Sequence, residues 1–137
     1  MRLTSDEIFY LNALNSASGA NARDCVVQGK VIAFLLKKKE LGKAIGKDAS
    51  AVKKLRQKLK LNVELLEYAD GPEEFIKKAL YNVKVKGVQV SEKNGKKLVS
   101  VSLEPGEKRA LLNGMPRLKR IKALAQRNYS IDDIKIH

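Results

Sequence analysis

Hydrophobic and polar positions recur along this chain first at helical and then at strand spacing. Ile8, Leu11 and Leu14 repeat as on one face of a helix. Thr4 and Glu7 lie three residues apart ahead of them, as in a capping box. The polar stretch "SASGAN" is expected to end this helix. Two strands, "DCVVQ" and "VIAFLLK", are predicted next, joined by a hairpin turn at "GK".

A sharp break interrupts the pattern after the second strand. We expect a short helical turn over residues 41–45, a break over residues 46–49 and a helix over residues 50–60. Ser50 is the expected N-cap of that helix. The apolar stripe of the helix consists of Val52, Leu55 and Leu59. The stretch "VELLEY" is predicted to be a third strand.

The same series of elements then occurs a second time. The stretch "EYADGPEE" gathers acidic residues around a Gly-Pro pair, which indicates a linker and a helix that starts at Pro72. The strands "VKGVQVSE" and "KKLVSVSLE" follow on either side of an Asn-Gly pair, a strong hairpin signal. A helical turn "EKRALLN", a basic helix "PRLKRIKALAQR" and a strand "IDDIKI" complete the series.

The two halves align with a shift of 66 residues, which places Ala44 on Ala110. Few residues are identical, but the order of helices and strands is the same in both halves. We therefore predict an α+β protein of two tandem domains, residues 1–69 and 70–137, each a small three-stranded sheet covered by helices.

Basic residues dominate the charge. The 137 residues include 28 Lys and Arg against 15 Asp and Glu, a formal net charge of +13. A surface this positive repels itself unless it meets a polyanion, which favours nucleic acid or an anionic membrane surface as partner. Solubility or adaptation to heat is the alternative explanation of many lysines. The uneven placement favours nucleic acid, because ten basic and only two acidic residues lie between Lys37 and Lys60.

Cysteine and histidine are too few for several kinds of site. Cys25 is the single cysteine, so no disulfide within the chain is possible, and we expect a buried strand thiol. His137 is the single histidine, which argues against structural zinc and against a catalytic Cys–His or Ser–His set. We expect a protein that is not an enzyme and needs no cofactor or metal. Without a membrane-spanning run or a signal peptide, a cytoplasmic protein is predicted.

The break "GKDA", residues 46–49, is the candidate binding site. Gly46 has no side chain to obstruct a nucleic-acid backbone, so the loop amides are able to donate to phosphate oxygens. The next helix presents its N-terminus, which favours anions, and Lys43 and Lys47 add charge beside the loop. A glycine turn with solvated lysines is the plainer alternative. The coincidence of loop, charge and strand order favours binding.

The stretch "ELGKAIGKDASAVKKL" resembles the G-x-x-G signature region of KH domains, and the order of strands around it is that of the type II form. "RDCVV", "VELLEYADGPEEFIKKAL" and "LAQRNYSIDDIKI" are also similar to the short archaeal form of the transcription termination/antitermination factor NusA, which is little more than two KH domains in tandem. This resemblance covers nearly the whole chain.

The resemblance implies a function in transcription elongation and termination, with single-stranded RNA as the partner and RNA polymerase as a further one. In KH domains the loop grips the RNA backbone while an aliphatic groove accepts about four bases. The RNA-binding residues expected on this basis are Lys43, Ile45, Gly46, Lys47, Asp48, Ala49, Ser50, Lys53 and Lys54.

Departures from the family pattern separate the two loops. Ala49 replaces the second glycine of the first loop, at a cost of about 1 kcal/mol if the position needs a left-handed backbone. Leu112 and Met115 replace both glycines of the second loop. We therefore expect the second domain to keep its fold but to lose the backbone clamp, with non-specific phosphate contacts remaining. The secondary RNA-binding residues are Asn113, Gly114, Arg117, Lys119 and Arg120.

A protein-interaction module is the alternative function. Such a module would dock on RNA polymerase or the ribosome through the acidic segment 64–74, with RNA binding reduced or lost. The altered second loop supports this alternative. A small-subunit ribosomal protein of the KH type shares the physics, but it usually has long basic tails or further domains. We expect a monomer with no membrane partner.

Overall fold

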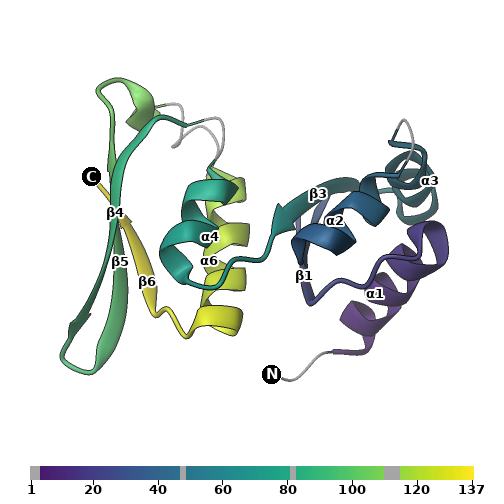
Figure 1. Ribbon diagram of the computed structural model, residues 1–137, viewed down its shortest axis with the longest axis horizontal. Coiled ribbons are helices and arrows are strands. Elements are labelled where there is room, and N and C mark those ends of the chain that lie inside the picture. The colour runs from purple at the N-terminus through teal and green to yellow at the C-terminus, as the bar shows by residue number, and fades with distance from the viewer. Residues whose placement is uncertain (1–3, 47–48, 81–82, 110–114) are drawn as a thin grey trace. The chain divides into compact units, whose positions relative to one another are not determined.

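The structure is a computed structural model that describes residues 4–46, 49–80, 83–109 and 115–137 (Figure 1). The chain divides into two compact units, Met1–Tyr68 and Ala69–His137, and the domain boundary expected from the sequence lies one residue later. The division falls at one peptide bond. The Tyr68 N–H donates to the Leu36 carbonyl within the first unit, whereas the Ala69 N–H donates to a tyrosine hydroxyl within the second.

The first unit has the order helix, strand, strand, helix, helix, strand. Its elements are α1 (Ser5–Ser18), β1 (Asp24–Gln28), β2 (Val31–Leu36), α2 (Lys38–Ile45), α3 (Ser50–Leu59) and β3 (Asn62–Glu67). The central strand β2 pairs antiparallel with β1 and parallel with β3. The parallel pairing requires a long crossover connection, and the helix pair α2–α3 supplies it.

Local chemistry sets the ends of the first elements. The Thr4 hydroxyl accepts from the Glu7 N–H at 3.2 Å and the Thr4 N–H donates to the Glu7 carboxylate at 3.0 Å, which confirms the predicted capping box. Gly19 ends α1 with a positive φ of 76°. Gly29, with a φ of 60°, turns the chain between β1 and β2 as predicted.

The core of the first unit lies between the sheet and its three helices. Its buried members are Ala13, Leu14, Ala20, Cys25, Ile32, Phe34, Leu36, Ala44 and Leu55. The thiol of Cys25 is fully buried and lies 3.7 Å from the Glu7 carbonyl oxygen, so the prediction of a buried strand thiol is confirmed. Because α2 and α3 contribute Ala44 and Leu55 to this core, their opposite faces are left for solvent or a ligand.

The second unit follows the same order in the residues that the structure describes. Its elements are α4 (Pro72–Ala79), β4 (Val85–Lys93), β5 (Lys96–Leu103), α6 (Met115–Tyr129) and β6 (Asp133–Ile136). The central strand β5 pairs antiparallel with β4 and parallel with β6, and Figure 1 shows α4 and α6 along one face of this sheet. Residues 107–109 are helical, at the start of the predicted turn "EKRALLN".

Turn and cap residues define the second unit as they do the first. Pro72 opens α4 in its first turn, as predicted. Asn94 and Gly95 both have positive φ, which is the geometry of the predicted hairpin turn between β4 and β5. Tyr129 stacks on Phe75 with ring centroids 5.2 Å apart, and its hydroxyl donates to the Ala69 carbonyl and accepts from the Ala69 N–H.

The predicted fold class is confirmed: the protein is α+β, with two small three-stranded sheets, each covered by helices. One predicted boundary was clearly wrong. The turn expected over residues 41–45 is a longer helix that begins at Lys38. Glu40 explains the difference, because its side chain is turned inward, is only 9% exposed and accepts from the Asn21 N–H.

Candidate nucleic-acid interface

Gly46 makes the chain turn between α2 and α3. Its φ of 64° and ψ of −168° lie in a region that is open essentially to glycine alone. A Cβ added to Gly46 would meet its nearest atom, the Ala51 Cβ, at an ordinary 3.7 Å. Space therefore does not explain this glycine. The backbone conformation does, and Gly46 itself is exposed.

Ala49 closes the loop in a left-handed conformation, with a φ of 56° and a ψ of 27°. Position 49 therefore does need a left-handed backbone, which is the condition under which alanine was predicted to cost about 1 kcal/mol there. Ala49 is the N-cap of α3, and Ser50 is the first helical residue, so the prediction of Ser50 as N-cap was wrong. An alanine has no side-chain oxygen to accept from the first-turn amides of α3, which favours an external acceptor there.

Lysines surround this loop on both helices. Lys43 lies near the end of α2 with 55% of its side chain exposed, and Lys53 and Lys54 are exposed on α3. The first turn of α3 contains no acidic residue. The ammonium group of Lys43 lies 3.3 Å from the carboxylate of Glu40, one turn back on α2. The interface is therefore positive on both sides of the exposed backbone.

An apolar side chain accompanies the charges. Ile45 precedes Gly46 and is 44% exposed, although large aliphatic residues are usually buried. Val52 on α3 is half-buried. The structure thus brings most of the predicted RNA-binding residues together around one loop, namely Lys43, Ile45, Gly46, Ala49, Ser50, Lys53 and Lys54. The predicted Lys47 and Asp48 lie outside the described residues.

The secondary residues predicted in the second unit have a different environment. Arg117 donates to the Ala79 carbonyl at the end of α4. Arg120 is buried, with 6% of its surface exposed, which leaves it little surface to offer a phosphate. Lys119 is exposed on the same helix. The predicted Asn113 and Gly114, together with Leu112, lie outside the described residues.

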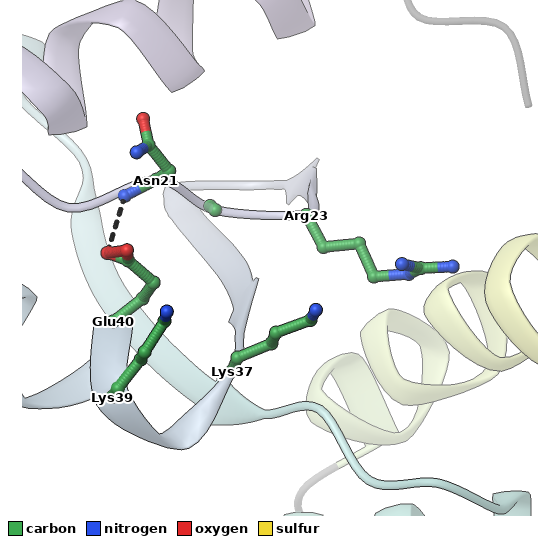
Figure 2. A pocket seen from close by; sticks show the side chains of 6 residues that line it. Asn21, Arg23, Lys37, Lys39 and Glu40 are labelled. Atoms are coloured by element: carbon green, nitrogen blue, oxygen red, sulfur yellow. Dashed lines mark hydrogen bonds between the residues drawn. The ribbon is translucent and has the colours of Figure 1, made fainter.

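Sequence reasoning missed a pocket at the other end of α2. The pocket has a volume of about 320 Å³ and is lined by Asn21, Ala22, Arg23, Lys37, Lys39 and Glu40. Figure 2 shows Lys37 and Lys39 rising from the start of α2 toward the segment that carries Asn21 and Arg23. Lys37 and Lys39 belong to the basic run noted in the sequence, but Arg23 precedes β1 and no spacing rule links it to them.

Glu40 is the acidic member of this pocket, and its oxygens are engaged. One oxygen accepts from the Asn21 N–H at 3.1 Å (Figure 2). The other accepts from the Lys43 ammonium at 3.3 Å. The hydrogen bond from Asn21 and the pairing with Lys43 hold the pKa of Glu40 below its usual range, although burial opposes this. The guanidinium of Arg23 lies 4.4 Å from the centre of the Tyr68 ring, a cation–π contact that orients it.

Two other kinds of site are absent from the part of the chain that the structure describes. No group of three or more His, Cys, Asp or Glu side chains is placed to hold a metal ion. No helix there has both the length and the apolar character needed to cross a membrane.

Known proteins resemble this chain over almost its whole length. It is 28% identical to a probable transcription termination protein NusA of Methanocaldococcus jannaschii, over 99% of this chain and 75% of that protein. It is 29% identical to the protein of the same name from Halococcus morrhuae, over 99% of each. A crystal structure of APE1850 matches with a TM-score of 0.85 and 28% identity, over 98% of this chain and 100% of that one. No family model matches the chain.

These findings confirm the resemblance to archaeal NusA proteins that the sequence motifs indicated. The similarity includes both units, since each comparison extends over at least 98% of the chain.

Proposed function

We propose, from this likeness to archaeal NusA proteins, that the protein binds single-stranded RNA and acts in transcription elongation or termination. The loop between α2 and α3 is the main grip on the RNA backbone. The observation that carries the proposal is the conformation of Gly46, which exposes main chain between two helices that carry accessible lysines.

The proposed contact has two parts. A phosphate accepts hydrogen bonds from amides of the loop and of the first turn of α3, where the helix dipole adds to the attraction. Lys43, Lys53 and Lys54 neutralise the neighbouring phosphates without reading bases. The exposed side chain of Ile45 provides an apolar surface for a base, so discrimination between sequences is expected to be modest.

The test is the affinity of the protein for a short single-stranded RNA before and after Gly46→Asp. The substitution adds a negative charge where phosphate approaches and forces a non-glycine residue into the Gly46 conformation, so we expect affinity to fall at least tenfold. Gly46→Ala separates the two effects, since it introduces the backbone strain without the charge.

Gly29→Asp is the matched control. Gly29 also has a positive φ, lies in the same unit and has no atom within 4 Å of an added Cβ. This control should keep RNA affinity within twofold of the wild type. If Gly46→Asp also stays within twofold, the loop is not the RNA site. Capture of partners from cell extract that persists after nuclease treatment would then favour the protein-interaction alternative.

A further inference from the structure

The exposed face of α2 connects the Gly46 loop with the basic pocket. Gly42 and Lys43 lie three and four residues after Lys39, and Gly46 lies four and three residues after them. The four residues therefore share one side of the helix, and all four are exposed. The pocket with Lys37 and Lys39 lies at the N-terminal end of this face. The eight residues of α2 span about 12 Å between the two features.

Gly42 has no structural reason to be glycine. A Cβ added there would meet no atom within 4 Å, and its φ is not positive. Glycine inside a helix destabilises it relative to alanine, because it loses more conformational freedom on folding. A bare backbone between Lys39 and Lys43 does allow another chain to approach α2 closely. Gly42 is therefore better explained by an external ligand than by packing.

The pocket offers cationic groups suited to phosphate. Lys37 and Lys39 form no ion pair with any of the described residues, and Tyr68 orients the guanidinium of Arg23. Glu40 directs its oxygens to the Asn21 N–H and to Lys43, which limits its repulsion of an anion. Three cations from two separate segments around one open hollow have the chemistry of a phosphate site.

We propose that the Lys39–Gly42–Lys43 face of α2 guides the RNA backbone from the Gly46 loop to a second phosphate site formed by Arg23, Lys37 and Lys39. This inference rests on the proposed RNA-binding function. A stacked strand advances about 3.4 Å per nucleotide, so the length of α2 corresponds to about three or four nucleotides. An RNA of four nucleotides centred on the loop covers only about half of α2, whereas one of eight nucleotides also reaches the pocket.

The first test compares oligouridines of four and eight nucleotides with the variant Lys37→Gln/Lys39→Gln. We expect the affinity for eight nucleotides to fall about tenfold and the slope of log affinity against log salt to become shallower by about 1.4, the loss of two phosphate contacts. The affinity for four nucleotides should stay within twofold. The control Lys30→Gln/Lys58→Gln removes the same charge from exposed positions of the first unit and should change the two affinities equally. The same pattern in control and variant would overturn the proposal.

The second test uses Gly42→Leu, which covers the bare backbone. We expect it to weaken binding of eight nucleotides about fivefold while the melting temperature stays at or above that of the wild type, because leucine favours the helix. Gly42→Ala should raise the melting temperature with a smaller loss of affinity. Unchanged binding by Gly42→Leu would overturn the track along α2.

Gly46→Asp separates this inference from the function on which it rests. If Gly46→Asp weakens both RNAs and the pocket variant behaves like its control, the second phosphate site is wrong and RNA binding by the loop stands. If Gly46→Asp weakens neither RNA, the proposed function itself fails. If the pocket variant loses nuclease-resistant capture of RNA polymerase but no RNA affinity, the pocket binds protein and the proposal is overturned.

Discussion

The helices α3 and α6 occupy corresponding positions in two units that have the same order of elements. Their basic residues nevertheless differ in exposure and in the contacts that they make. Lys53 and Lys54 of α3 are exposed beside the Gly46 loop. Arg120, which aligns with Lys54, is buried in the second unit. Lys122 of α6 pairs with Asp133 at 3.2 Å. The two basic helices therefore offer unequal charge to a ligand, because α6 uses Arg117, Arg120 and Lys122 within its own unit.

Substitutions in the two hydrophobic cores should have the largest effects on stability and RNA binding. Phe34 of the first unit and Phe75 of the second are both fully buried, so either change to alanine should destabilise its own unit by about 3–5 kcal/mol. If the RNA grip lies in the first unit, Phe34→Ala should abolish binding and Phe75→Ala should reduce it only a few-fold. Hydrogen exchange read separately for each unit would verify which one has opened. Loss of binding only with Phe75→Ala would reverse the assignment.

Matched single substitutions on the two helices sharpen the comparison. Lys54→Gln should lower RNA affinity about threefold and reduce the salt slope by about 0.7, with little change in stability. Arg120→Gln should instead lower stability by about 1–3 kcal/mol, because it removes a buried, bonded side chain, while affinity changes less than twofold. Salt-dependent binding titrations and denaturant unfolding measure the two effects. A larger affinity loss with Arg120→Gln would mean that the burial of this residue is relieved on binding.

The first loop itself gives a smaller effect. Ala49→Gly places glycine at a left-handed position and should stabilise the first unit by about 0.5–1 kcal/mol, since relief of strain exceeds the added flexibility of the unfolded chain. RNA affinity should rise by no more than about twofold. Thermal unfolding checks the prediction, and a destabilised variant would show that the methyl group of Ala49 makes contacts worth more than the strain.

The smallest expected effect is a change in how the stability of the first unit depends on pH under acidic conditions. The folded pKa of Glu40 lies below its unfolded value, so its contribution to stability is present above the unfolded pKa and is lost as pH falls through the folded pKa. Glu40→Gln should therefore lower the stability of the first unit at neutral pH and flatten its decline below about pH 4.3. Melting temperatures from pH 7 to pH 3 measure this. Parallel curves for wild type and variant would contradict it.

Features governed by a few neighbouring residues could be predicted from the sequence. The capping box of Thr4 and Glu7, the helix start at Pro72 and the turn at Asn94 and Gly95 all depend on chemistry within one turn of the chain. The position of two strands before the loop and one strand after it could also be predicted, because it depends only on the order of elements along the chain. These predictions needed no knowledge of distant contacts.

Features governed by distant partners could not be predicted in the same way. Nothing in the sequence links Glu40 to Asn21, yet the Glu40 carboxylate accepts from the Asn21 N–H and Glu40 lines the pocket. Arg120 was predicted to bind RNA at the surface, because nothing in its sequence neighbourhood signals that it is buried. Ser50 is not the N-cap because it is itself the first residue of α3, and the left-handed Ala49 takes the N-cap position.

The single thiol gives the first unit a reporter of its own opening. Cys25 is the only cysteine in the sequence, it lies in the first unit, and none of its surface is exposed. A thiol reagent can therefore modify the protein only when that unit opens, and the rate of modification measures the free energy of that opening. RNA that binds the folded first unit should slow the reaction in proportion to its occupancy. The natural chain thus carries a binding assay that needs no label on the RNA.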